Sequence, residues 1–503
     1  MRRREHTDVI VVGAGIAGAA AALELAAGDV EFMGIDKADR FGGTARRGGV
    51  GCSIAGSPLQ LESGLSDGMP RAVDDLMANG NDADRTWARF YYRRAVADVY
   101  GWYRQLGVDF DGLLHFEGDS VARWHRPAGG GARVMEMARK KFAERGLEQC
   151  WHFGLTVTDL LRDGERICGV RIKTASGQRA KLRARAVILA TGGFAGNLDM
   201  SRAASPQLRN AARLLAGGNP DSQGNLHTIA ARHGACLSSM GNVYTYANGT
   251  PDYRDPSGKR GVVVRRVRSC VWVNRSGERF HDEDLHITGL SATGKLMRQD
   301  GQTCWIVLPE ATLPEVEIFD HYIEPGSDSP AETVARFFSH SPFVSKAESL
   351  HGLAGKIGVD ARTLEKTIAD WNSLLSSGAA RDPLTDRDLV GLRPLSDGPW
   401  CAIQLFPLVR KTLGGVATDL RCRVLDRSGA PIHGLFAAGE LAGMGGGHLA
   451  GSRPLEGLMA GGSVFSGRIA GRWAARTLRT SAGRGQAMRE RNAASSEMLT
   501  RTA

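Results

Sequence analysis

The stretch DVIVVGAGIAG, residues 8–18, decides the fold of this chain. Its first half is an apolar run of the length of one buried parallel strand, and three glycines with the spacing GxGxxG follow at once. The alanine-rich residues 19–27 then predict a helix. In this context Gly13 allows a tight turn, Gly15 lets a pyrophosphate approach the backbone, and Gly18 lets the helix pack on the strand. The stretch predicts the nucleotide-binding turn of a Rossmann-type domain; a glycine-rich turn without a ligand is the alternative.

Later segments favour FAD over NAD as the nucleotide. Residues 31–35 predict a second strand, and the carboxylate of Asp36 at its end suits a ribose hydroxyl. Glycine turns recur at residues 42–44, 187–193 and 434–440. Three separated segments indicate one extended cofactor held along its length. A second dinucleotide fingerprint is not found, which argues against stable NAD(P) binding.

The composition is that of a folded enzyme. With 503 residues, of which 42% are hydrophobic and 23% charged, two domains are expected, with room for a cofactor between them. The eight cysteines stand singly without metal-ligand spacing, so no metal site is expected. We find neither a signal peptide nor a run of membrane-span length, and the cytoplasm is the expected compartment. The net charge of +10 lacks a basic stripe interleaved with aromatics, so it favours anionic substrates over nucleic acid.

Two further segments, KTLGG at residues 411–415 and GGGHLAGSR at 445–453, extend the pattern. Together with the glycine turns they resemble the fumarate reductase and succinate dehydrogenase flavoprotein family, which includes the 3-ketosteroid dehydrogenases. The resemblance implies an α/β fold in which an α+β capping domain interrupts a Rossmann-type FAD-binding domain. It places the FAD-binding domain at residues 1–241 and 404–480, the cap at 242–403 and a polar C-terminal tail at 481–503.

The fingerprint and the resemblance together define the expected FAD-binding residues. In that family Glu440 would bind the ribityl chain, and a helix beginning near Leu455 would point its N-terminus at the flavin O2 edge, where its dipole stabilises reduced flavin. Tight helix packing is the alternative explanation of glycines 457–462. Relatives with covalent FAD use a histidine just after the second glycine turn, but residues 45–47 here are Ala-Arg-Arg, which predicts noncovalent FAD. The full expected set is Gly13, Gly15, Ala17, Gly18, Asp36, Lys37, Gly43, Thr44, Gly48, Gly49, Val157, Thr191, Gly192, Gly439, Glu440, Arg453, Leu455, Gly457 and Leu458.

Arg453 is the main candidate for substrate binding. It stands where the family keeps a substrate-clamping arginine, and a guanidinium fork binds a carboxylate through two hydrogen bonds. A surface role or an ion pair with Glu456 is the alternative. His448 is a second candidate, with a structural role equally open.

Three departures from the family pattern change the side chains that could act as catalytic acid or base. The proton-donating arginine segment is replaced by residues 284–288, which contain His286; a cap-surface role is its alternative. A segment that contains a histidine in the family corresponds to residues 244–246 here, and Tyr246 occupies the histidine position. Core packing is the alternative role for Tyr246. The histidine of a third segment is replaced by Lys411, with Arg410 beside it.

These features predict an FAD-dependent desaturase that introduces a C=C bond next to the carbonyl of a small cyclic keto acid, such as 4-oxocyclohexanecarboxylate. A tyrosine near cations suits proton transfer from the carbon beside a ketone. The expected partners are this anionic carbonyl substrate and an electron acceptor of open identity: oxygen, a quinone or a carrier. The alternatives are an enoate reductase running the reverse reaction, a 3-ketosteroid dehydrogenase, and a non-catalytic flavin-binding electron-transfer subunit. Residues 400–406 contain no tyrosine, which argues against a steroid.

Overall fold

The computed structural model describes residues 6–281, 290–319 and 329–500, with the side chains of the last helix described as far as Arg479. The chain forms two compact units. The first unit contains Met1–Gly192, Asn225–Ser239 and Leu413–Ala503, and the second contains Gly193–Gly224 and Met240–Thr412. Residues 193–224 and 404–412 thus pack in the unit that holds the predicted cap segment. The cap boundaries at 242 and 403 stay a prediction.

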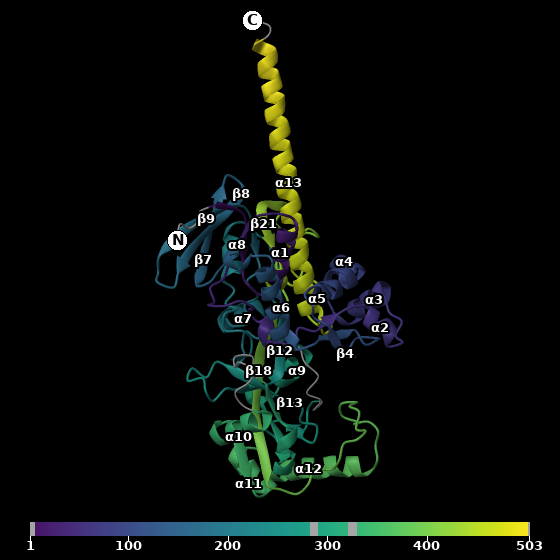
Figure 1. Cartoon of the computed structure of the whole chain (residues 1–503). Helices are drawn as coiled ribbons and strands as arrows, with labels where there is room; N and C mark the ends of the chain where they lie inside the picture. The colour runs from purple at the N-terminus through teal and green to yellow at the C-terminus, as the bar shows by residue number, and fades with distance from the viewer. Residues whose placement is uncertain (1–5, 282–289, 320–328, 501–503) are drawn as a thin grey trace. The chain divides into compact units, whose positions relative to one another are not determined.

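A mainly parallel sheet forms the core of the first unit, in the order β20-β21-β9-β1-β2-β6. Strands β9 and β21 of this sheet are labelled in Figure 1. Its strands are β1 His6–Val12, β2 Phe32–Ile35, β6 Trp151–His152, β9 Arg179–Leu189, β20 Arg423–Leu425 and β21 Pro431–Ala437, with β7 Leu155–Asp163 and β8 Arg166–Thr174 joined to β9. Short strands complete the unit: β3 Cys52–Ser53, β4 Phe110–Leu114, β5 Trp124–Pro127, β11 Leu237–Ser238 and β19 Gly415–Val416. The three strands that precede glycine turns, β1, β9 and β21, are adjacent in the order β1-β9-β21, and both pairs are parallel.

The helices of the first unit cover this sheet and extend beyond it. They are α1 Ile16–Ala27, α2 Pro58–Glu62, α3 Met69–Asn79, α4 Arg85–Ala95, α5 Gly101–Gln105, α6 Gly130–Glu144, α8 Asn225–Arg232 and α13 Leu458–Thr500. Helix α1 begins three residues before the predicted Ala19, because the helix starts at the second glycine of the fingerprint. Residues 481–500, predicted as a polar tail, continue α13.

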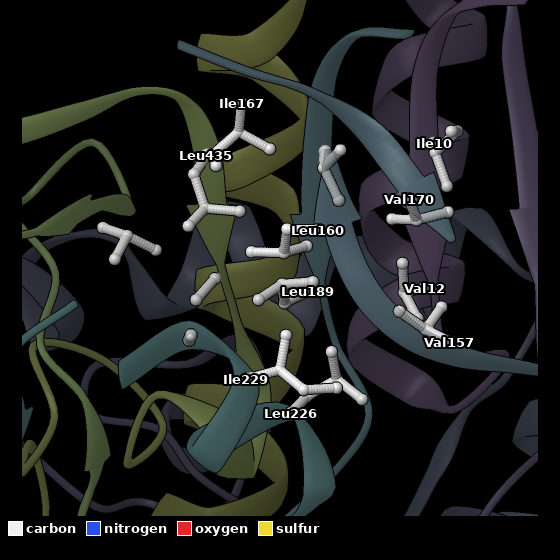
Figure 2. Packing of buried hydrophobic residues seen from close by; sticks show 14 of the residues in the cluster. Ile10, Val12, Val157, Leu160, Ile167, Val170, Leu189, Leu226, Ile229 and Leu435 are labelled. Atoms are coloured by element: carbon white, nitrogen blue, oxygen red, sulfur yellow. The ribbon is translucent and has the colours of Figure 1, made fainter. Parts of the chain in front are cut away.

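Buried aliphatic side chains fill the space between the sheet, the β7–β8 hairpin and α8 (Figure 2). Ile10 and Val187 lie side by side on β1 and β9 and are fully buried. Leu435 of β21 pairs with Val187 and is equally buried. Burying side chains of this size stabilises a fold by roughly 1.5–3 kcal/mol each. This packing holds the ends of β1, β9 and β21, and therefore their glycine turns, at one edge of the sheet.

The second unit is built on a mixed sheet in the order β14-β15-β18-β12-β13-β16, with β10 and β17 also paired to β18. Its strands are β10 Leu215–Ala216, β12 Val243–Pro251, β13 Gly261–Arg265, β14 Val271–Val273, β15 Cys304–Pro309, β16 Glu317–Phe319, β17 Val344–Ala347 and β18 Trp400–Thr412. Its helices are α7 Leu198–Ala204, α9 Leu290–Met297, α10 Pro330–His340, α11 Leu350–Ile357 and α12 Ala361–Ser376. Alternate residues of β15 and β18 pack against α9 and α10 on one face and against α11 and α12 on the other. Among the described residues, none of the helices is both long and apolar enough to cross a membrane.

Candidate active site

The turn after β1 has the geometry of a phosphate cradle. Gly13 has φ +110°, and a Cβ on it would meet the carbonyl oxygen of Ala190 at 2.3 Å. A Cβ on Gly18 would meet the Gly13 carbonyl oxygen at 1.8 Å, whereas a Cβ on Gly15 would meet nothing within 4 Å. Gly13 and Gly18 are therefore required by packing, and Gly15 borders open space at the N-terminus of α1. No side chain caps that helix end, so its first N–H groups remain donors for a phosphate.

Asp36 follows β2 and holds the same turn in place. Its carboxylate accepts hydrogen bonds from the backbone N–H groups of Ala14 at 2.6 Å and Ala38 at 2.8 Å. The second glycine turn lies next to it: Gly42 N–H donates to the Ala14 carbonyl, and a Cβ on Gly43 would lie 3.2 Å from the Gly15 Cα. The carboxylate has lone pairs left for ribose hydroxyls, so these residues fit an adenine dinucleotide. The bond to Ala14 is a structural role that sequence reasoning missed.

The Asp36→Ala variant should bind FAD about 10- to 100-fold more weakly than the parent. The expected loss is roughly 1.5 to 3 kcal/mol, because ribose hydroxyls lose a charged acceptor and the Ala14 N–H loses its partner. Affinity is measured by titrating flavin-free protein with FAD and following flavin fluorescence. Asp39→Ala, which removes an exposed carboxylate three residues later and outside the expected cofactor set, is the control and should leave FAD affinity unchanged. Unchanged FAD affinity of the Asp36 variant would contradict the assignment.

The remaining expected cofactor residues gather around these turns or take packing roles. Ala438 N–H donates to the Leu189 carbonyl at 2.9 Å, and a Cβ on Gly439 would contact Ala17 at 2.8 Å. Thr191 and Gly192 therefore follow β9, and Glu440 follows the neighbouring strand β21; these three residues are half-buried. Val157 differs from the others, because its side chain is buried in the sheet core and only its backbone can face a ligand.

The start of α13 packs against the segment that follows the second glycine turn. Gly457 has φ +91°, and a Cβ on it would meet the Ser53 nitrogen at 2.3 Å. Farther along the helix, a Cβ on Gly467 would meet the carbonyl oxygen of Ala17 in α1 at 2.3 Å. Tight packing thus explains the glycines of α13, and the same packing brings the helix N-terminus beside β3. Gly131 of α6 donates its N–H to the Gly48 carbonyl, which fixes the segment with Gly48 and Gly49 from another side.

Two tyrosines of α4 hold β3, and sequence reasoning did not single them out. Tyr91 donates to the Ser53 carbonyl at 2.7 Å, and the Tyr92 hydroxyl lies 3.0 Å from the Ser53 hydroxyl. Burial raises the pKa of both phenols above the ordinary value, so they stay protonated and act as hydrogen-bonding supports. Burial likewise raises the pKa of the Cys52 thiol to about 12, which keeps it from serving as a thiolate nucleophile. The amphipathic pattern of residues 85–95 was the available signal.

A buried charge cluster supports the same region. Arg123 is fully buried and bonds to Asp67 through two nitrogens at 2.7 and 3.0 Å, to Asp75 at 2.5 Å and to Asp119 at 3.0 Å. Three carboxylates share one guanidinium, and the second oxygen of Asp119 has no hydrogen-bond partner in the structure. Burial raises the pKa of Asp119 to about 6, although Arg123 works in the opposite direction. Keeping Asp119 ionised near neutral pH therefore lowers the stability of the folded protein.

Asp119→Asn should stabilise the protein at about pH 8 by up to about 3 kcal/mol, and by less at about pH 5. The pKa of Asp119 in the folded state lies above its ordinary value of 3.8, so folding takes up a proton between these values and stability falls as the pH rises through the window. Asparagine removes that loss and keeps the acceptor for Arg123. Thermal unfolding at both pH values measures the effect. Asp67→Asn, which weakens a bidentate pair, is the control and should destabilise at both. A lower melting temperature of Asp119→Asn at about pH 8 would contradict the prediction.

Arg453 stands on a loop that is anchored firmly just before it. Ser452 N–H donates to the Asp82 carboxylate at 2.7 Å, and Asn81 donates to the Ser452 hydroxyl at 2.9 Å. A Cβ on Gly451 would meet the Gly80 carbonyl oxygen at 2.1 Å. The Arg453 side chain is exposed and has neither a hydrogen bond nor an ion pair to any residue that the structure describes. The considered ion pair with Glu456 is therefore not formed, and Arg453 offers a free guanidinium five residues before α13.

His448 has partners within the first unit. Its Nδ1 lies 3.2 Å from the Ser238 hydroxyl, and its Nε2 lies 3.9 Å from a carboxylate oxygen of Asp84, the N-cap of α4. These contacts connect the glycine loop to β11 and α4. They support the structural alternative for His448, while its catalytic role stays a prediction.

The tyrosines predicted for catalysis lie on β12 of the second unit. Tyr244 pairs with Lys411 and Tyr246 with Leu408 across the β12–β18 ladder, and the two rings contact each other edge-on with centroids 5.6 Å apart. The Lys411 ammonium lies 5.4 Å from the Tyr244 ring centroid. Tyr244 is buried, whereas Tyr246 is half-buried beside a small apolar cluster. Lys411 thus contacts Tyr244, and the tyrosine predicted for catalysis is Tyr246.

Arg410, predicted beside Lys411, and Arg266, another arginine of this unit, have defined partners. Arg410 is buried and donates to the Gly217 carbonyl at 2.7 Å, and Arg266 pairs with Glu317 at 2.7 Å. His286 lies outside the described residues. The roles of these side chains in catalysis stay predictions.

A mainly parallel sheet whose glycine turn, open cradle and strand-end acid meet at one edge defines a dinucleotide-binding protein of the Rossmann class. Comparison with known proteins agrees: residues 8–459 match the family model described as an FAD binding domain, and the chain belongs to this family. The match confirms the predicted α/β FAD-binding fold and FAD as the cofactor.

Individual relatives span nearly the whole chain. A probable fumarate reductase of Shewanella frigidimarina is 28% identical over 472 residues, covering 93% of this chain and 74% of its own. A KsdD-like steroid dehydrogenase of Mycobacterium tuberculosis is 28% identical over 548 residues, with 94% and 96% covered. The structure of a 3-ketosteroid-delta4-(5alpha)-dehydrogenase from Rhodococcus jostii, in complex with 4-androstene-3,17-dione, has a TM-score of 0.69 and 27% identity, with 93% and 97% covered. These findings confirm the predicted resemblance and an FAD-dependent oxidoreductase.

Proposed function

We propose that this FAD-dependent dehydrogenase, whose relatives work on carbon–carbon bonds, introduces a C=C bond next to the carbonyl of a small cyclic keto acid. The observation that carries the proposal is the free guanidinium of Arg453 on its anchored loop. An arginine without a protein partner is suited to bind the carboxylate of a substrate through two hydrogen bonds. A molecule of the class of 4-oxocyclohexanecarboxylate carries both that carboxylate and the ketone that activates the adjacent carbon.

When bound, FAD supplies the hydride acceptor. Arg453 binds and orients the substrate carboxylate, with Arg410 or Lys411 contributing positive charge. Tyr246, acting as the phenolate, takes the proton from the carbon beside the ketone, and the hydride leaves from the next ring carbon, so that the C=C bond forms between the two. The N-terminal end of α13, packed on β3 through Gly457, provides a positive helix dipole that favours reduction.

The proposal is tested by anaerobic mixing of the FAD-loaded protein with 4-oxocyclohexanecarboxylate while the yellow flavin absorbance is followed. We expect bleaching with the keto acid, and much slower bleaching with cyclohexanone, which lacks the carboxylate, or cyclohexanecarboxylate, which lacks the ketone. Bleaching by 4-androstene-3,17-dione alone would assign the steroid activity. Reoxidation of chemically reduced enzyme by fumarate, without bleaching by any ketone, would assign the reverse reaction. Absence of both responses would leave the non-catalytic flavin-binding role.

The bound FAD should be released intact when the protein is denatured. The segment after the second glycine turn is Ala45-Arg46-Arg47, which has no histidine for covalent attachment. Acid precipitation followed by absorbance of the supernatant measures the released flavin. Yellow colour that stays with the precipitate would contradict this expectation.

A further inference from the structure

A cavity lies in the first unit between α4, the turn before β20 and the middle of α13. Its volume is about 360 Å³, which is within the range of small-molecule sites. Its walls combine apolar side chains with guanidinium groups. The lining residues are Phe90, Arg94, Leu420, Arg421, Ile469, Arg472, Trp473 and Arg476. None of these residues belongs to the proposed FAD or substrate site.

Trp473 is the centre of this cavity. The Arg421 guanidinium lies 4.4 Å from the Trp473 ring centroid, and the Arg476 guanidinium lies 5.1 Å from it. Two guanidinium groups thus contact the same indole ring, so cationic groups and an apolar ring lie together in this cavity. The side chain of Leu420, 37% exposed, stands at the opening as an exposed apolar surface.

The charge balance of the walls leaves room for an anion. Arg94 and Arg472 are matched by the buried carboxylate of Asp98, at 2.6 Å each. Arg421 has no carboxylate partner among the described residues. The carboxylate of Asp419, two residues earlier, already accepts from the Arg423 guanidinium and from the backbone N–H groups of residues 421 and 423. Arg421 is therefore the guanidinium in this cavity best placed to bind an external anion.

We propose that the cavity binds a small organic anion with a flat apolar ring body. The ring packs against Trp473, Phe90 and Ile469, and the anionic group bonds to Arg421 at the edge. An aromatic carboxylate or sulfonate has this chemistry. A concave cavity of this volume with apolar walls buries a ring of this kind. If the flat acidic surface of another protein bound here instead, the apolar walls would stay in contact with water.

Isothermal titration calorimetry of the FAD-loaded protein tests the site with a matched pair of probes. Naphthalene-2-sulfonate carries the charge, and naphthalene-2-sulfonamide has the same rings without it. We expect the sulfonate to bind with one-to-one stoichiometry at least about tenfold more tightly than the sulfonamide, and its binding to weaken as salt is raised. Equal affinity of the two probes, or no binding of either, would overturn the proposal.

Two variants locate the binding. Arg421→Gln should weaken the sulfonate about tenfold and leave the sulfonamide unchanged, while Trp473→Leu should weaken both. Arg427→Gln is the matched control, because Arg427 is an exposed arginine on the turn between β20 and β21 that does not line the cavity. Sulfonate binding that is unaffected by Arg421→Gln would place the anion elsewhere and overturn the assignment. Thermal unfolding of each variant confirms that the fold is retained.

Discussion

With a keto acid, replacing Arg453 by alanine is expected to lower the ratio of the flavin-reduction rate constant to the substrate dissociation constant by more than about tenfold. Without its guanidinium a desolvated substrate carboxylate is left unpaired, at a cost of roughly 2 to 5 kcal/mol. The protein around Arg453 should be little affected, because the side chain is exposed and bonds to no described residue. Anaerobic stopped-flow measurement of flavin bleaching over a series of substrate concentrations separates the two constants.

The lysine variant sharpens this test. Arg453→Lys should recover only part of the loss, because an ammonium offers a point charge and lacks the planar pair of donors. The FAD content of each variant is measured first, since Arg453 is also in the expected cofactor set. Arg427→Ala, which removes an exposed arginine elsewhere in the same unit, should behave like the parent. If Arg453→Ala bleached as fast as the parent, the substrate carboxylate would be bound by another residue.

Tyr246→Phe is expected to slow flavin reduction at saturating substrate by about 10² to 10⁴, the usual effect of losing one positioned proton-transfer group. Phenylalanine keeps the ring that packs on Tyr244 and removes only the oxygen, so the fold and the FAD content should persist. The rate is measured by stopped flow with matched FAD content. A loss of less than about threefold, far below that range, would reassign Tyr246 to packing.

Tyr244→Phe is the matched comparison, since the two tyrosines lie two residues apart on β12 and their rings touch. The structure places Lys411 on Tyr244, which makes this variant informative. If Tyr244→Phe lost more activity than Tyr246→Phe, the proton acceptor would be Tyr244. If neither variant were slow, His286 would be the next residue to replace.

Local sequence patterns predicted the strand, turn and helix of the first segment well. The apolar run of residues 8–12, the glycines and Asp36 act within one short segment, and such segments are governed by local packing and turn chemistry. In the structure Gly13 and Gly18 have no room for a Cβ, and Gly15 borders open space. That these residues bind FAD stays a prediction. The boundaries were less accurate, with α1 beginning three residues early.

The predictions for individual catalytic residues were less complete, because their environments depend on distant partners. The loop of Arg453 is anchored by Asn81 and Asp82, about 370 residues away in the chain. His448 meets Ser238 across a separation of 210 residues. No periodicity or motif in the chain encodes such pairs.

The sequence by itself therefore determined the Rossmann turn, the choice of FAD and the family. The turn depends on one strand, turn and helix, and the other two depend on several short glycine motifs spread along the chain, each formed by local turn chemistry. Only the tertiary structure decided which charged side chains are free. Arg123 shares three carboxylates, Arg410 bonds to a backbone carbonyl, and Arg453 has no described protein partner. All three are arginines of identical intrinsic chemistry. What separates them is whether folding brings an acceptor within about 3 Å, because a guanidinium with its hydrogen bonds already made has few left for a ligand.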